Sequence, residues 1–317
     1  MSIWIALTLM AALMQSVRTA GQKSLGHGLT ASGAAVVRYL YGLPFALIYL
    51  AVLIFWSGAD ETSFVVIPNL ELRFWGYALF AAICQLIATA LMVWLFRFRN
   101  FALGSFYVKT EAMLAAVLGV LIWSESLSLL AWLSIALGAV GIFLMGQGKA
   151  SLLIKSDQGK TLSWGQRIKH FLLDPAAGVG LLAGLLFALT SLSLRQASLS
   201  LNLDFQLGAA VTLVVMVILQ TLIGALYLSW RSPSDWKAMK LQTGVCAFVG
   251  LTSVVGSVGW FTAMTLQPVA YVKAVGQIEF VFTLLVAVLF FKERPSPIEL
   301  IGMGAILSGV LLLLLVG

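Results

Sequence analysis

Two pairs of glutamates with identical spacing frame apolar stretches of this chain. Glu111 and Glu125 lie fourteen residues apart, and Glu279 and Glu293 repeat that spacing 168 residues later. An acidic residue at the centre of a membrane span costs about 2.5–3.5 kcal/mol on insertion scales. Glu111 and Glu279, near the middle of their stretches, are therefore expected either to bind a proton or a cationic group, or to hydrogen-bond a neighbouring helix. Glu125 and Glu293 stand at the ends of stretches, where a helix cap is the simpler interpretation.

Lys109 and Lys273 bring basic groups into the same stretches. Lys109 lies two residues before Glu111, and Lys273 lies six residues before Glu279. On a helix, Lys109 is therefore turned about 200° away from Glu111, and Lys273 about 240° away from Glu279. Neither lysine can easily pair with the glutamate of its own helix. Each is expected to contact another helix, cavity water or an anionic group of a substrate, and snorkelling to the interface is an alternative for Lys273.

Other polar and aromatic residues of the apolar stretches are candidate substrate contacts. Arg38 presents a planar group suited to carboxylate or phosphate, or it snorkels toward a basic loop. Buried amides usually hydrogen-bond between helices, although they can also line a cavity. Aromatic side chains stack on a solute or form an interfacial belt. The full set of candidate substrate-binding or coupling residues is Lys109, Glu111, Lys273, Glu279, Gln85, Gln277, Arg38, Tyr107, Tyr271 and Trp260.

The composition is that of a membrane protein. Of the 317 residues, 61% are hydrophobic and 10% are charged, and the mean hydropathy is +1.02, whereas soluble domains are roughly 25% charged. The net charge of +7 does not indicate nucleic-acid binding, because nearly all lysines and arginines lie between the apolar stretches. Cys84 and Cys246 predict neither a disulfide framework nor a metal site.

The motifs of enzymes and of ATP-driven pumps are absent from the sequence. His27 and His170, the two histidines, both lie in loops, and there is no metalloprotease, serine-hydrolase or phosphate-loop motif. We therefore expect neither an enzyme nor a cofactor, and a membrane-embedded enzyme is the weakest of the functional hypotheses.

Ten apolar segments are long enough for spanning helices, which need about 20 residues each. They are residues 2–20, 33–56, 74–96, 101–123, 126–146, 176–196, 206–230, 242–265, 268–291 and 297–316. Weak matches recur in the same order in both halves, such as Tyr107-Val-Lys109 and Tyr271-Val-Lys273. The sequence therefore predicts an all-α polytopic membrane protein with a duplicated unit.

The duplication predicts how the chain is divided. A first five-helix repeat covers residues 1–146, a polar linker covers 147–175, and a second five-helix repeat covers 176–317. Because five is odd, the second repeat must cross the membrane in the opposite sense. The expected fold is ten transmembrane helices arranged as two inverted five-helix repeats, a construction common in secondary transporters.

The basic residues predict the orientation. Loops on one side hold most of the lysines and arginines, Arg18 among them, whereas Arg73 and Arg195 are placed on the other side with acidic residues. The positive-inside rule makes the basic side cytoplasmic. Both termini are then expected outside the cytoplasm, with the first apolar segment retained as a span rather than cleaved as a signal peptide.

The chain resembles the EamA-like branch of the drug/metabolite transporter superfamily. The two glutamate spacings, ending in Ser-Glu125 and Lys-Glu293, carry the resemblance, together with the stretch Arg-Pro-Ser-Pro-Ile-Glu-Leu-Ile-Gly-Met-Gly-Ala that runs into the last span. The resemblance implies export or exchange of small organic solutes by alternating access around a central cavity. It also implies the inner membrane of a bacterium. Family members are commonly drawn with cytoplasmic termini, and the charge bias here departs from that picture.

Two transport functions follow as hypotheses. The first is secondary active export or exchange of small metabolites such as amino acids or organic anions, because acidic and basic groups share one membrane layer. The second is a flippase for a lipid or lipid-linked sugar. The expected partners are a small-molecule substrate, membrane lipids and protons, and the expected assembly is a monomer or homodimer, with no nucleic acid.

Overall fold

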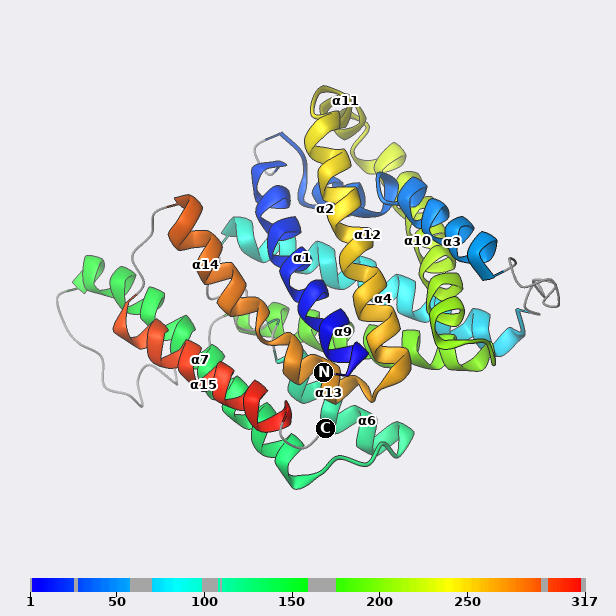
Figure 1. The fold of residues 1–317 in the computed structure, drawn as a ribbon. Helices are drawn as coiled ribbons and strands as arrows, with labels where there is room; N and C mark the ends of the chain where they lie inside the picture. The colour runs from blue at the N-terminus through cyan, green and yellow to red at the C-terminus, as the bar shows by residue number, and fades with distance from the viewer. Residues whose placement is uncertain are drawn as a thin grey trace.

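The fold is helical throughout the part of the chain that the computed structural model describes, which is residues 2–25, 28–57, 70–98, 108, 110–158, 175–291 and 296–314. Figure 1 shows the helices as a layered bundle. Their bounds are α1 (Ile3–Leu25), α2 (Ala31–Leu40), α3 (Leu43–Ser57), α4 (Leu72–Phe98), α6 (Glu111–Trp123), α7 (Leu129–Gln158), α9 (Pro175–Ser200), α10 (Phe205–Arg231), α11 (Ser234–Leu241), α12 (Thr243–Leu266), α13 (Val269–Gly276), α14 (Glu279–Phe291) and α15 (Pro297–Leu314).

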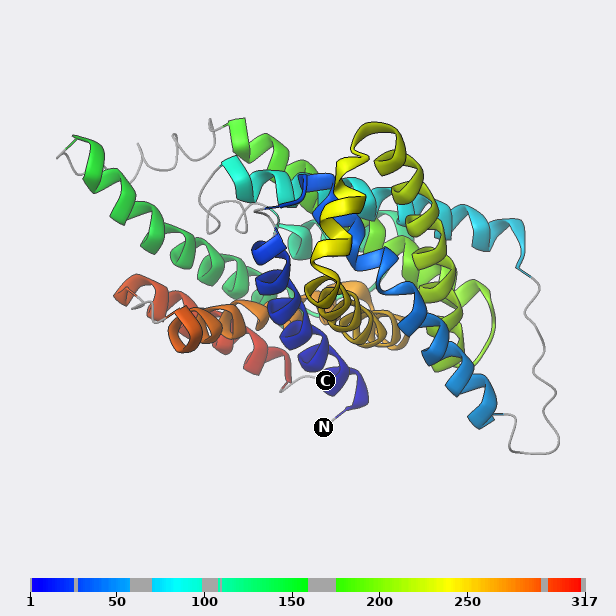
Figure 2. The same ribbon diagram turned by 90° about the horizontal axis from the view of Figure 1, so that it is seen from above.

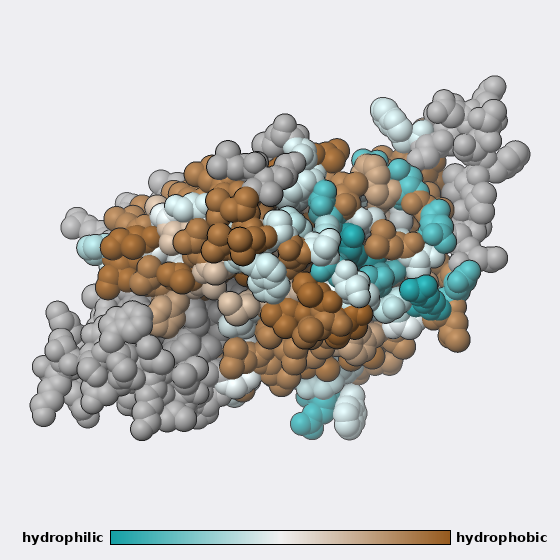
Figure 3. Space-filling model, turned by 90° about the horizontal axis from the view of Figure 1, so that it is seen from below, coloured by the Kyte–Doolittle hydropathy of each residue, from teal (hydrophilic) through white to brown (hydrophobic). Residues whose placement is uncertain are grey.

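Among the described residues, six helical segments have the length and apolarity needed to cross a membrane. They are Ile3–Gln22, Ala31–Trp56, Leu72–Leu95, Gly178–Ser200, Phe205–Arg231 and Thr243–Leu266. Three shorter apolar helices accompany them, Glu111–Trp123, Leu129–Leu144 and Leu300–Leu313. Large apolar side chains are exposed along the spans, and Figure 3 shows broad apolar areas on one face. The predicted all-helical, multi-pass membrane protein is confirmed, and the count of ten spans stays a prediction.

The predicted segment 33–56 is divided into α2 and α3 by a turn at Tyr41 and Gly42. Pro44 contributes to this break because it has no N–H to donate to the carbonyl four residues earlier. Gly250 of α12 packs directly on the turn: a Cβ built on Gly250 would stand 2.5 Å from the carbonyl carbon of Tyr41. The turn is thus held by close backbone contact with the second half of the chain.

The predicted segment 268–291 is also divided, so the expectation of one continuous helix there is wrong. Between α13 and α14 the bonds tighten to the 3₁₀ pattern, with Gln277 N–H donating to the Ala274 carbonyl at 3.3 Å and Phe280 N–H donating to the Gln277 carbonyl at 3.1 Å. Gly276 precedes the change, and a Cβ there would overlap the ring of Trp260. The packed indole leaves room only for glycine at this point.

Three side-by-side helix pairs join the two halves of the chain, α1 with α12, α4 with α9, and α7 with α15 (Figures 1 and 2). Small residues allow this close approach, as is usual between membrane helices. A Cβ on Gly259 of α12 would lie 2.5 Å from the Leu7 carbonyl oxygen of α1, and one on Gly141 of α7 would lie 2.5 Å from the Gly302 carbonyl oxygen of α15. Each pair contains one helix from residues 1–158 and one from 175–314.

Arg195, which the sequence placed in a loop, lies within α9 and ties three elements together. Its guanidinium donates to the carbonyls of Met264, Thr265 and Gln267 at the end of α12 and stands 3.4 Å from the Glu125 carboxylate. Positive charge at a helix C-terminus is favourable because it meets unpaired carbonyls. Burial raises the pKa of the Glu125 carboxyl, and the Arg195 charge opposes that rise.

The predicted cap of the fifth span by Glu125 is wrong. Ser128 occupies that position instead, and its hydroxyl accepts a hydrogen bond from Ala131 N–H at 3.2 Å in the first turn of α7. The corresponding expectation for Glu293 lies outside the described residues.

The close contact at Gly250 gives a matched test within one helix. Gly250→Ala is expected to lower the midpoint of thermal unfolding in detergent, because its methyl group meets the backbone of the α2–α3 turn. Gly244→Ala in the same helix meets no atom within 4 Å, so it should be neutral or stabilising, by up to about 1 kcal/mol from helix propensity. Equal midpoints for the two variants would contradict the proposed backbone contact.

Candidate functional site

Glu111 and Glu279 occupy the same local position, although they lie in different halves of the chain. Each is the first residue of its helix, α6 and α14 respectively, and each is 7% exposed. A carboxylate in the first turn is favoured by the unpaired N–H groups and the dipole of the helix. Gly184 of α9 lets the start of α6 approach, since a Cβ there would stand 2.7 Å from the Thr110 hydroxyl.

Lys273 of α13 forms an ion pair with Glu111 of α6, contacting its Oε1 atom. Only 15% of the lysine side chain and 9% of the glutamate side chain are exposed. Ser191 of α9 donates a further hydrogen bond to the same carboxylate oxygen at 3.3 Å. Of the partners expected for Lys273, which were another helix, cavity water or a substrate anion, the structure shows another helix. The Lys273–Glu111 ion pair joins the two halves of the chain.

Trp260 extends this contact toward the second glutamate. The Lys273 ammonium lies 4.9 Å from the centroid of the Trp260 ring, within range of a cation–π interaction. The indole N–H donates to Gln15 Oε1 at 3.0 Å, and Gln15 Nε2 donates to Glu279 Oε2 at 2.6 Å. A continuous series of polar contacts thus joins Glu111 to Glu279; we call Glu111, Lys273, Trp260, Gln15 and Glu279 the intramembrane network.

The helix carrying Gln15 also fixes the backbone of Glu279. Ser16 donates to the Glu279 carbonyl at 3.1 Å and receives a hydrogen bond from Thr283 at 3.2 Å. Arg18, which the sequence assigned to a loop, is instead a buried residue of α1 with 5% exposure. It is close enough to Glu279 to be attracted by the carboxylate. The assignment of Arg18 to the cytoplasmic loop is therefore wrong.

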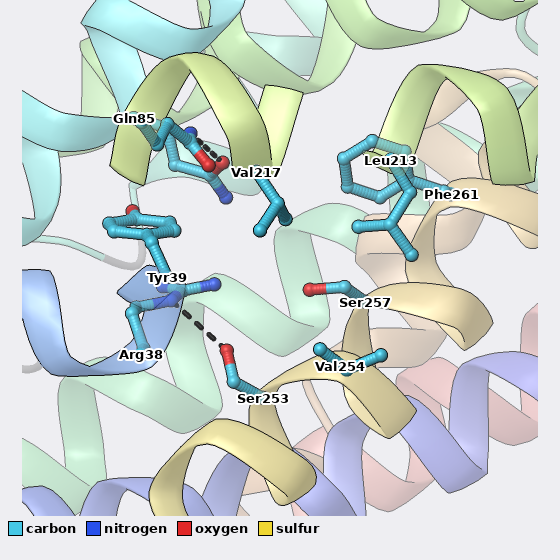
Figure 4. Close-up of a pocket in the computed structure, with 10 residues that line it drawn as sticks. Arg38, Tyr39, Gln85, Leu213, Val217, Ser253, Val254, Ser257 and Phe261 are labelled. Carbon is cyan, nitrogen blue, oxygen red and sulfur yellow. Dashed lines mark hydrogen bonds between the residues drawn. The ribbon is translucent and has the colours of Figure 1, made fainter. Parts of the chain in front are cut away.

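Arg38 lies at a separate, small cavity between α2, α4, α10 and α12 (Figure 4). The cavity has a volume of about 10 Å³, close to what one water molecule requires. Arg38 Nε donates to the Ser253 hydroxyl at 3.2 Å, and the guanidinium lies 4.9 Å from the Tyr39 ring centroid. Gln85 also lines this cavity and accepts a hydrogen bond from Gln220 at 2.7 Å.

Two further predicted residues make packing contacts outside both groups. Gln277 is 4% exposed, and its amide covers Gly138 of α7 so closely that any side chain at 138 would overlap it. The Tyr271 hydroxyl accepts a hydrogen bond from Ser128 N–H at 3.3 Å. Tyr107 and Lys109 lie outside the described residues.

Sequence reasoning did not assign Gln15, Ser191 or Arg18 to the site. Gln15 and Arg18 are polar positions in the first apolar stretch, so an unusual density of polar groups there was a usable signal. Ser191 carries no such signal, because it is one of several small polar residues along α9.

The comparisons with known proteins agree with this architecture. Residues 175–315 match the EamA-like transporter family. This match confirms the predicted resemblance over the second half of the chain, and the family is one of membrane transporters of small solutes. No curated protein matches the chain.

A likeness to a solved structure extends over the whole chain. One crystal structure is similar with a TM-score of 0.69 and 12% sequence identity, over 99% of this chain and 96% of that chain. At this identity the likeness shows the fold alone.

The ion pair predicts a characteristic pattern of stability. Lys273→Met or Glu111→Gln alone should lower the free energy of unfolding, by about 3–5 kcal/mol where a buried charge is left uncompensated. The double variant should recover most of this loss, because neither charge then remains. Unfolding midpoints in detergent for the wild type, both single variants and the double variant measure the coupling. Strictly additive losses would show that the two charges do not depend on each other.

Proposed function

We propose that the protein is a secondary active transporter that exports or exchanges small organic solutes by alternating access. Its ten spans would form two inverted repeats, residues 1–146 and 176–317, joined by the linker 147–175. The family match over residues 175–315 supports small-solute transport. The ion pair between Lys273 and Glu111 is the observation that carries the mechanism, since it joins the halves that must move relative to each other.

The pattern of helix contacts supports the repeat arrangement. In the proposed duplication α1 corresponds to α9, α4 to α12 and α7 to α15. If each helix is replaced by its counterpart in the other half, the contacting pair α1–α12 becomes α9–α4, which is also a contacting pair. The pair α7–α15 becomes α15–α7, which is the same pair. The contact of α6 with α9 likewise converts into that of α14 with α1. Inverted repeats related by a two-fold axis produce this exchange.

The intramembrane network supports a coupling role for protons. While Glu111 is ionised, it holds Lys273 and therefore α13 against α6. A proton on Glu111 would remove the attraction and leave Lys273 with the Trp260 ring as its nearest partner. Because Trp260 also contacts Gln15, the change would reach Glu279 through two hydrogen bonds. Protonation on one side of the membrane could thus alter contacts in both halves.

Flux through liposomes containing the purified full-length chain tests this function. A panel of labelled amino acids and organic acids is assayed with an imposed pH gradient, and at least one solute should move. Glu111→Gln and Lys273→Ala should each reduce its initial rate roughly tenfold or more, which corresponds to about 1.4 kcal/mol of lost coupling.

Two matched controls remove the same charges from exposed positions, Glu71→Gln and Lys237→Ala, and should transport normally. Unchanged flux in the two network variants would remove Glu111 and Lys273 from the mechanism. Movement of a labelled lipid between leaflets, without flux of any water-soluble solute, would replace the proposed function with that of a flippase.

A further inference from the structure

Arg38 is a buried cation with no anionic partner in the described part of the chain. It is 5% exposed, so it does not extend to the surface. Of its five N–H donors, one is used for Ser253, and its other contact is the face of Tyr39. Buried charges are costly unless they are paired. A ligand that supplies negative charge would offset that cost.

A second buried arginine makes the surroundings of Arg38 more positive. Arg18 of α1 is near enough for the two positive charges to repel, and its Nε atom has no hydrogen-bond partner in the described structure. Glu279 attracts Arg18 and balances one of the two charges. Among these described groups one positive charge remains in excess, and this excess favours an anion beside Arg38.

The polar lining of the Arg38 cavity includes several hydrogen-bond donors. Gln85 uses its carbonyl oxygen to accept from Gln220, which leaves the Gln85 amide N–H groups available. Ser257 places a hydroxyl at the same cavity. A guanidinium, an amide and a hydroxyl converging on one space match the acceptor oxygens of a carboxylate.

The opposite wall of the cavity is apolar. Figure 4 shows Arg38, Tyr39 and Gln85 on one side, with Leu213 and Phe261 facing them across the space. A volume of about 10 Å³ holds about one water molecule in this conformation, so a solute enters only when the surrounding helices move apart. The one guanidinium without an anionic partner then suits one carboxylate rather than a dianion. The lining therefore suits a single negative charge attached to an apolar body.

We propose that the cavity between α2, α4, α10 and α12 binds the carboxylate of a small monocarboxylate with an apolar chain, and that Arg38 is its principal contact. This inference rests on the proposed transport function and narrows its substrate class. It places the solute's charge on Arg38, while Lys273 stays paired with Glu111.

Binding by the purified full-length protein in detergent tests the inference directly. Thermal unfolding is followed by tryptophan fluorescence with increasing butyrate or butyramide, at constant ionic strength set with sodium chloride. Butyrate should raise the unfolding midpoint and butyramide should not. Acetate should act more weakly than butyrate, because it leaves the apolar wall uncovered. An equal effect of chloride alone would show a site for any small anion and would overturn the assignment to a solute.

Substitutions of Arg38 and of its hydrogen-bond partner separate the effect of the positive charge from the effect of side-chain size. Arg38→Gln should weaken the butyrate response at least roughly thirtyfold, the least expected from losing a buried charge contact, whereas Arg38→Lys should keep part of it. Arg231→Gln, at the exposed end of α10, is the matched control and should respond as the wild type does. If Arg38→Gln does not fold, Ser253→Ala, which releases the guanidinium, should still weaken binding. An undiminished response in Arg38→Lys, Ser253→Ala and Arg38→Gln alike would overturn the inference.

Flux measurements distinguish failure of this inference from failure of transport. Carboxylate flux that falls in Arg38→Gln, with normal flux in Arg231→Gln, supports both proposals. If only neutral or cationic solutes are transported, and their flux is the same in Arg38→Gln as in the wild type, the transport function is supported and the carboxylate site is contradicted. Butyrate binding without flux of any solute supports the site and contradicts the transporter.

Discussion

The stability of ionised groups inside an apolar bundle is the constraint on which this structure depends. A charge removed from water needs a nearby opposite charge or several hydrogen bonds. Lys273 and Glu111 satisfy this requirement for each other, and they do so from opposite halves of the chain. Separating α13 from α6 would expose both groups to an unfavourable environment at once. The pair therefore links the position of the helices to the ionisation of two side chains.

The positions at which α6 and α14 begin explain how the glutamates can be accommodated. Irregular backbone is tolerated at membrane depth only where protein or a cavity surrounds it. Glu111 and Glu279 each begin a helix, so the positive end of a helix dipole lies close to each carboxylate. Glycines provide the required space, with Gly184 beside the start of α6 and Gly276 beneath the Trp260 ring. Backbone and charge therefore depend on each other at both sites.

The sequence predicts the general architecture better than the contacts. Composition and apolar segments indicate a helical membrane protein, because lipid requires both. The divisions at Tyr41–Gly42 and Gln277–Ile278 were missed because apolar residues continue on both sides of them, although Pro44 beside the first division is a helix-breaking residue. The partner of Lys273 was also beyond local reasoning: Glu111 is distant in sequence and meets it only through packing. The placement of Arg18 in a loop failed because a single arginine near the end of an apolar stretch does not reveal whether it is buried.

Lys273 and Arg38 differ in what neutralises them, and this difference separates their proposed roles. Lys273 has a carboxylate within the protein, so an external anion would have to compete with Glu111 for it. Arg38 meets only a hydroxyl and an aromatic face in the described structure, so an anion could bind without displacing an internal partner. Binding at Arg38 gains the full attraction of the charge, whereas binding at Lys273 would gain only the difference between two carboxylates. In the proposed mechanism an anionic solute therefore favours Arg38, and the Lys273–Glu111 pair is left free to respond to protons.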